Sequence, residues 1–172
     1  EITRFGHWKD TAIMLKGDAV QSFTMLFLEM WAVNQMEPAD CQNYLTPKHV
    51  VPDPPHGYVI PYGDHPYDNE NVGEEVYFHI LNHSKKYVHI MTPYLILDSE
   101  MITTLTRAAK SGIEVIIIMP HIPDKWYAFV LAHTYYKELI QAGVSIYEYT
   151  PGFVHAKVFV SDDDTATVGT IN

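Results

Sequence analysis

The chain has 172 residues, of which 47% are apolar and 13% aromatic, so it suits one ordinary domain with a buried core rather than a disordered segment. Its formal net charge of −10, from 21 acidic residues against 11 lysines and arginines, repels the phosphate backbone of DNA or RNA and disfavours general nucleic-acid binding. The single cysteine excludes an internal disulfide and fits a reducing compartment.

The first part of the chain has few regular patterns. The alternating, β-branched stretch at about 11–16 predicts a short strand. Asp18 is typical of a helix N-cap, and apolar residues at helical spacing predict a helix from there to about Asn34. The proline-rich residues 35–56 predict a long loop, and residues 57–63 a short strand that ends in a polar loop.

From residue 72 onwards, helices and strands alternate. Strand 113–119 is apolar on both faces, which is typical of the middle of a covered, parallel sheet. We therefore expect an α/β fold, a layered α-β-α sandwich with a mixed, mostly parallel sheet. The expected helices are 72–84, 98–111 and 124–141, with Asp98 and Asp124 as N-caps and Gly112 as a C-cap, and the expected strands are 87–92, 113–119, 144–149, 155–162 and 165–170.

Polar residues with a chemistry in common gather in the last 18 residues. On a strand, His155 and Lys157 would point to the same face because side chains alternate. A histidine can be a nucleophile or a general acid or base, and a neighbouring lysine can stabilise charge on a phosphate. Asp162 could fix an imidazole tautomer or organise neighbouring donors, Asn172 could donate to a phosphoryl oxygen, and Gly169 with Thr170 would let the backbone approach a substrate. This set predicts phosphoryl transfer without a metal or other cofactor.

The spacing His-x-Lys-x4-Asp-x6-Gly-Thr-x-Asn resembles the HKD motif of the phospholipase D superfamily. Three longer stretches resemble bacterial cardiolipin synthases within it, although Lys9 and Leu95 replace the usual Arg and Phe. These stretches are "HWKDTAIMLKGDAVQSFTMLFLEMW", "IMTPYLILDSEMITTLTRAAKSGIEVIIIMP" and "YYKELIQAGVSIYEYTPGFVHAKVFVSDD".

The resemblance implies a phospholipase D-like fold in which two HKD motifs of one chain face each other across one active site. This chain carries only the second motif, so we expect a piece of a longer protein, cut at both ends. Residues 1–34 would be the strand and helix that follow the absent first motif, and residues 57–172 the second half. The missing first half of the same chain is therefore an expected partner.

The resemblance also implies the reaction. One histidine of such a pair attacks a phospholipid phosphodiester and forms a phosphohistidine, while the other protonates the leaving group. Cardiolipin synthases transfer a phosphatidyl group between two phosphatidylglycerol molecules and release glycerol. Membrane-spanning segments that are absent here would hold the parent protein in the cell membrane, with its catalytic region in the cytoplasm. We expect His155 to be the acid and base, with the nucleophile as the alternative, and Tyr94 to line the substrate entrance.

Other interpretations remain open. The chain could be a single-motif, nuclease-like phosphodiesterase that acts as a homodimer, which the acidic charge disfavours, or a non-catalytic module, which the intact motif disfavours. His79 and His83 have the spacing of a helical metal pair, but surface histidines explain them more simply. Trp126 and Tyr127 are either ordinary rim residues or part of an apolar surface that faces lipid.

Overall fold

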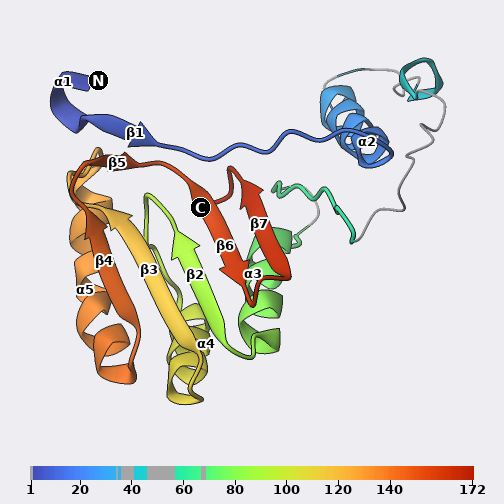
Figure 1. The fold of residues 1–172 in the computed structure, drawn as a ribbon. Coiled ribbons are helices and arrows are strands. Elements are labelled where there is room, and N and C mark those ends of the chain that lie inside the picture. The colour runs from blue at the N-terminus through green and yellow to red at the C-terminus, as the bar shows by residue number, and fades with distance from the viewer. Residues whose placement is uncertain (1, 34, 36–40, 46–56, 67–68) are drawn as a thin grey trace. The chain divides into compact units, whose positions relative to one another are not determined.

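The computed structural model describes residues 2–33, 35, 41–45, 57–66 and 69–172. These residues form two compact units (Figure 1). The larger unit comprises Glu1–Ala12 and Glu74–Asn172, and the smaller unit comprises Ile13–Gly73.

A five-stranded mixed sheet forms the centre of the larger unit, in the order β4-β3-β2-β6-β7 (Figure 1). Strands β2, β3 and β4 are parallel, whereas β6 runs antiparallel to both β2 and β7. All five strands occupy positions where the sequence predicts strands. Their bounds are Tyr87–Met91 for β2, Glu114–Pro120 for β3, Ser145–Tyr149 for β4, Lys157–Ser161 for β6 and Thr165–Gly169 for β7.

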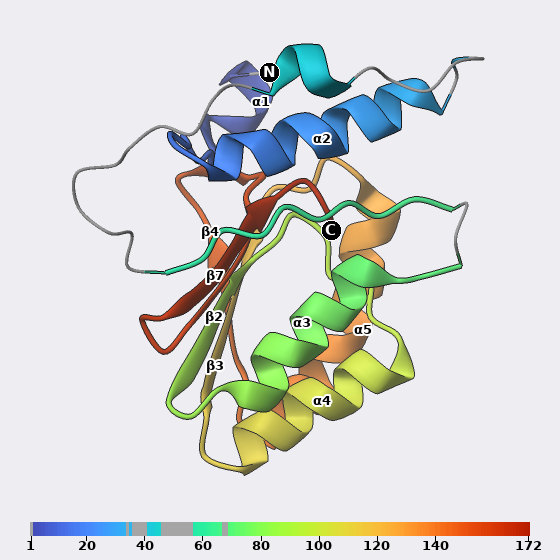
Figure 2. The same cartoon turned by 90° about the vertical axis from the view of Figure 1, so that its right-hand side faces the viewer.

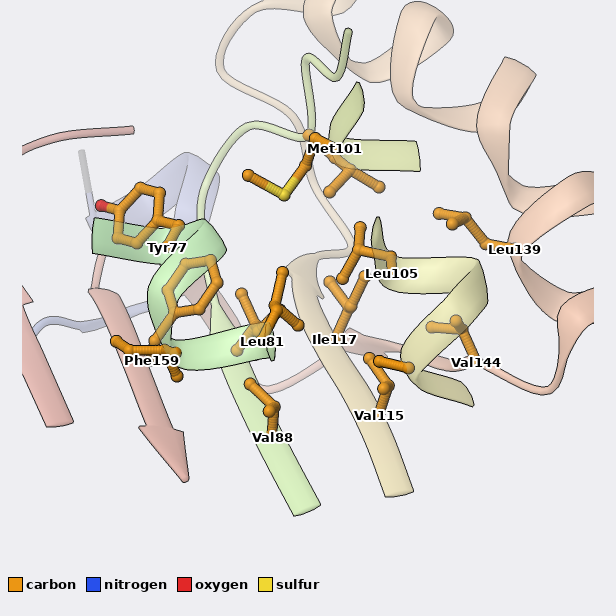
Figure 3. Close-up of a cluster of buried hydrophobic side chains, with 14 of the residues drawn as sticks. Tyr77, Leu81, Val88, Met101, Leu105, Val115, Ile117, Leu139, Val144 and Phe159 are labelled. Carbon is orange, nitrogen blue, oxygen red and sulfur yellow. The ribbon is translucent and has the colours of Figure 1, made fainter. Parts of the chain in front are cut away.

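Three helices, α3 (Val72–His83), α4 (Ser99–Lys110) and α5 (Trp126–Ala142), cover one face of this sheet (Figure 2). The core lies between these helices and alternate residues of β2 and β3, including Val88 and Ile117, both fully buried (Figure 3). The layered α/β class with a mixed sheet is confirmed. Strand β3 is buried on one face only, since Ile116 and Ile118 on its other face are half-buried.

The N-terminal segment adds a second, two-stranded sheet to this unit. Helix α1 (Ile2–Phe5) leads into β1 (His7–Lys9), which pairs in parallel with β5 (Gly152–Val154). The buried Phe153 ring lies 4.8 Å from the Trp8 ring and 5.3 Å from the Phe5 ring, centroid to centroid. This packing fixes residues 5–9 beside the segment that precedes β6.

Local signals explain most helix ends. The Asp98 carboxylate accepts a hydrogen bond from the Met101 amide at 2.7 Å and caps α4 as predicted. Gly112 (φ +91°) and Gly143 (φ +104°) follow α4 and α5 in the left-handed conformation that glycine adopts at little cost. The prediction for Asp124 is wrong, because Lys125 occupies the N-cap of α5 and Asp124 bonds to Tyr94 instead.

The smaller unit contains the predicted helix, α2 (Ala19–Ala32), although the Asp18 side chain makes no capping hydrogen bond. A short 3-10 helix, η1 (Cys41–Tyr44), lies within the predicted loop, of which residues 36–40 and 46–56 fall outside the described residues. The strands predicted at 11–16 and 57–63 are wrong, since both stretches lack regular structure. Among the helices that the structure describes, none combines the length and apolarity needed to cross a bilayer.

Candidate active site

The carboxyl ends of β2, β3 and β4 meet at one edge of the sheet, and Lys157 lies at the same edge. Lys157 begins β6, whose next residue, Val158, pairs with Met91 at the end of β2. In open α/β sheets, ligands bind outside the carboxyl ends of the strands. The edge that holds Lys157 is therefore the natural place for a site.

His155 and Lys157 are in contact, but they do not share a strand as predicted. After β5 the backbone bends, because the amides of both His155 and Ala156 donate to the Lys9 carbonyl, at 2.9 and 3.2 Å. Strand β6 then begins at Lys157. The Lys157 Nζ reaches back to donate to His155 Nε2 at 3.0 Å and to the His155 carbonyl oxygen at 2.7 Å.

Asp10 completes this arrangement from the N-terminal segment. The His155 Nδ1 lies 3.0 Å from Asp10 Oδ2, and this hydrogen bond is the main cause that lowers the pKa of the Asp10 carboxyl, with the Thr11 amide second. The ionised Asp10 carboxylate accepts a hydrogen bond from the Nδ1–H of His155, which leaves the Nε2 lone pair to face the Lys157 ammonium. The imidazole is therefore held between a carboxylate and an ammonium.

Lys157 is almost fully buried, with 7% of its surface exposed. Burial lowers the pKa of its ammonium, and the negative charges of Asp10 and Asp124 oppose that shift. A buried ammonium attracts a neighbouring anion strongly because little water screens its charge. The position suits a group that binds a phosphate oxygen.

Tyr94 and Asp124 form a second pair at the same edge. The Tyr94 hydroxyl donates to Asp124 Oδ2 at 2.7 Å, and burial together with this carboxylate raises the pKa of Tyr94 to about 12. The buried Thr92 hydroxyl donates to the Tyr94 carbonyl at 2.8 Å, which fixes the turn after β2. The Asp124 charge is one of the two that raise the pKa of the Lys157 ammonium.

Asp162 lies at the opposite edge of the sheet from His155. It follows Ser161, the last residue of β6. Its carboxylate accepts hydrogen bonds from the amides of Lys85, Lys86 and Tyr87, at 2.6, 2.9 and 2.9 Å. These amides lower its pKa, that of Tyr87 most. The structure therefore does not bring Asp162 to the imidazole, and this carboxylate ties the β6–β7 turn to the start of β2.

The remaining predicted residues lie around the end of β7. Gly169 pairs with Lys157 in the β6–β7 register, and a Cβ added there would meet open space. Thr170 and Asn172 are exposed. Among the contacts of the residues that the structure describes, no hydrogen bond joins the side chain of Thr170 or Asn172 to the histidine–lysine pair.

The residues that the structure describes include no group of three or more His, Cys, Asp or Glu side chains able to hold a metal ion. His79 and His83 are both exposed, and their rings stack with centroids 4.0 Å apart. The His83 Nδ1 lies 2.8 Å from the His79 carbonyl oxygen, where it can donate a hydrogen bond.

The sequence reasoning assigned no role to Asp10, although it lies in one of the stretches that resemble cardiolipin synthases. The available signal was the "WKDT" sequence, in which Asp10 follows Trp8 by two positions. Its contact with His155, 145 positions away in sequence, depends on the β1–β5 pairing.

The family model for the phospholipase D-like domain of cardiolipin synthase matches residues 77–172, more than half of the sequence. The chain belongs to this family. It is 36% identical to a cardiolipin synthase of Geobacillus kaustophilus and 38% identical to cardiolipin synthase 2 of Bacillus cereus, each over 98% of this chain. An uncharacterized protein of Streptococcus mutans is 57% identical over the whole chain.

The chain spans about a third of the length of these relatives, 37% of the Streptococcus mutans protein and 33% and 32% of the two cardiolipin synthases. Among solved structures, the phospholipase D family member Nuc from Salmonella typhimurium aligns with a TM-score of 0.46 and 21% identity. That alignment covers 58% of this chain and 63% of Nuc.

Proposed function

We propose that the chain is part of a cardiolipin synthase that transfers a phosphatidyl group from one phosphatidylglycerol molecule to another and releases glycerol. The observation that carries the proposal is the hydrogen-bonded series Asp10–His155–Lys157 at the carboxyl edge of the sheet, in a chain of the cardiolipin synthase family. Residues 1–34 and 57–172 would belong to the catalytic region, which faces the cytoplasm from the cell membrane in the parent protein.

The imidazole of His155 would exchange a proton or a phosphoryl group through Nε2. Because Asp10 accepts from Nδ1, Nε2 is the atom left with a lone pair, and the carboxylate stabilises the imidazolium that forms when Nε2 takes a proton. Lys157 would bind a non-bridging phosphate oxygen and stabilise the charge of the transition state. Tyr94, Gly169, Thr170 and Asn172 would line the substrate site around this pair.

The reaction requires a second histidine. In the first half-reaction, one Nε2 forms a bond to phosphorus while the phosphorus–oxygen bond to glycerol breaks, and the other histidine gives its proton to the departing alkoxide. In the second half-reaction, that histidine removes a proton from the hydroxyl of the acceptor lipid, whose oxygen bonds to the phosphorus while the phosphorus–nitrogen bond of the phosphohistidine breaks and frees the imidazole. We assign the proton transfers to His155 and the attack to the histidine of the first motif, in the part of the parent protein outside this chain.

Asp162 would serve the site indirectly. Its three backbone hydrogen bonds hold the β6–β7 turn against the α3–β2 loop, and so fix the two strands that begin at Lys157 and end at Gly169.

The experiment uses the parent protein with phosphatidylglycerol vesicles and measures cardiolipin and glycerol together. His155→Ala and Lys157→Ala should each lower the rate by about 10²–10⁴-fold, the usual contribution of a general acid or base or of a positioned charge. Lys110→Ala, which removes an exposed lysine at the end of α4, is a matched control. A parent protein that makes no cardiolipin, together with an unchanged His155→Ala variant, would refute the proposal.

Two further outcomes separate the alternatives. Phosphodiester hydrolysis by a homodimer of the 172-residue chain would support the single-motif phosphodiesterase. If neither assay detects any activity, but the protein still binds lipid or another protein, the non-catalytic module would be supported. A verified monomer of the 172-residue chain should have no synthase activity, because one histidine cannot act on both sides of the phosphorus at once.

A further inference from the structure

The N-terminal half of α5 presents a strongly exposed apolar surface at the same edge as His155 and Lys157. Trp126 is 73% exposed, Tyr127 58%, Val130 55% and Leu131 36%. Residues at these spacings lie on one side of a helix. We call these four residues the α5 patch.

The patch is confined to the half of α5 that begins at the carboxyl edge of the sheet. Helix α5 starts six residues after the end of β3, so its first turns lie at this edge (Figure 1). Farther along α5 the exposed side is mainly polar, with Ile140 as an exposed apolar residue among Thr134, Lys137, Glu138 and Gln141.

The patch is continuous with the candidate site. Asp124 accepts a hydrogen bond from the Tyr94 hydroxyl at 2.7 Å, and it lies only two residues before Trp126, the first residue of α5. Ile96, 60% exposed in the segment after Tyr94, adds a further apolar side chain at this edge.

We propose that the α5 patch docks the site onto the surface of a lipid bilayer, with Trp126 and Val130 inserted at the level of the headgroups. This inference rests on the proposed function, which places a phospholipid phosphodiester at the His155–Lys157 pair. The acyl chains of that substrate remain in the bilayer, so the site must approach the membrane along the edge that carries the patch. Tryptophan and tyrosine favour this position because each has an apolar body and a polar tip.

Charge determines the kind of lipid contact. The chain carries a formal net charge of −10, so attraction to anionic lipids does not drive binding. The contact is therefore apolar, and binding should be at least as strong to neutral phosphatidylcholine vesicles as to vesicles that contain phosphatidylglycerol.

The first test measures co-sedimentation of the 172-residue chain with phosphatidylcholine vesicles. Trp126→Ser combined with Val130→Ser should weaken binding about tenfold or more, because two exposed apolar side chains no longer enter the interface. Tyr127 stays in place since it neighbours Tyr94. Ile140→Ser with Tyr147→Ser is the matched control, because these residues are 54% and 57% exposed but lie outside the patch; this variant should bind like the wild type.

Three results would overturn the proposal. One is wild-type binding by the patch variant with a native circular dichroism spectrum. Another is loss of binding caused instead by Phe27→Ser with Trp31→Ser, the exposed aromatic pair of α2. The third is a change from dimer to monomer in the patch variant without any change in vesicle binding, which would make the patch a protein interface. The single Trp126→Ser variant repeats the test if the double variant does not fold.

A second assay separates this proposal from the proposed function. In the parent protein, the patch variant should lose about tenfold in rate on phosphatidylglycerol vesicles but stay within about twofold on a short-chain, monomeric phosphatidylglycerol. His155→Ala should lose both activities. A wild-type parent that is inactive on both substrates refutes the proposed function alone, whereas equal losses of the patch variant on both substrates refute the docking role alone.

Discussion

Replacing Gly152 with alanine should impair the site by displacing Asp10 from His155. Gly152 pairs with His7 between β5 and β1. A Cβ at Gly152 would overlap the His7 carbonyl oxygen. It would also lie 2.7 Å from the His7 carbonyl carbon and 2.9 Å from the His7 backbone nitrogen. All three are backbone atoms, so no change of rotamer can relieve the overlap and β1 must move.

The size of the movement follows from these distances. Ordinary van der Waals contact begins at 3.4 Å, so the His7 carbonyl carbon must withdraw by at least 0.7 Å, the difference between 3.4 and 2.7 Å, and its oxygen by more. The Asp10–His155 distance of 3.0 Å would then exceed that of a good hydrogen bond. A misplacement of about 1 Å costs on the order of 10²-fold in rate, and overpacking of this kind costs about 1–3 kcal/mol of stability.

The assay is kcat/KM for transfer by the parent protein, with Gly63→Ala as the control because a Cβ there meets only ordinary contact, at 3.6 Å. If Gly152→Ala acts through Asp10, it should add little in an Asp10→Ala background, since the two changes remove the same interaction. If the double variant loses kcat/KM by the product of the two single losses, this reasoning is refuted. Wild-type activity in a folded Gly152→Ala protein would refute it as well.

Three further predictions concern charge and packing. Asp162→Ala should lower the melting temperature at pH 7, and because the native carboxyl has a lowered pKa, its stabilisation should be present above about pH 3.8 and lost as the pH falls below that value, so that the two melting curves converge in acid. Asp124→Asn removes a charge that raises the pKa of the Lys157 ammonium, so the alkaline limb of the pH profile for kcat/KM should move to lower pH; an unchanged limb would contradict this. Ile117→Ala, at a fully buried position, should cost about 2–5 kcal/mol in urea unfolding, and the half-buried Ile116→Ala should cost clearly less.

The sheet of the larger unit was predictable because its strands and helices have strong, long patterns. Strand β3 is apolar at every position after Glu114, and glycines mark the ends of the helices beside it. The same kind of reasoning failed at 11–16 and 57–63. A strand is stable only when a neighbour satisfies its backbone groups, and alternation in one segment does not tell whether a neighbour exists.

The two-stranded sheet β1–β5 could not be predicted in the same way. Each strand has three residues, which is too short for a period to be recognised. The pairing depends instead on Gly152, which permits the close approach, and on three aromatic rings that pack together. Asp10 reaches His155 through this small sheet. The sequence patterns therefore did not predict that Asp10 supplies the carboxylate of the site.

Asp162 shows that the spacing of a motif does not decide between the two roles predicted for one of its residues. His155, Lys157 and Asp162 are close in sequence, but a five-residue strand separates the last two by about 13–17 Å at 3.2–3.4 Å per residue. The strand therefore places the histidine and lysine at one edge of the sheet and the aspartate at the other, where three backbone amides hold it. The carboxylate that meets the imidazole comes from Asp10, at the other end of the chain. The fixed spacing of Lys157 and Asp162 along β6 therefore has two equally good explanations. One is the chemistry at the start of the strand, and the other is the anchoring of its end.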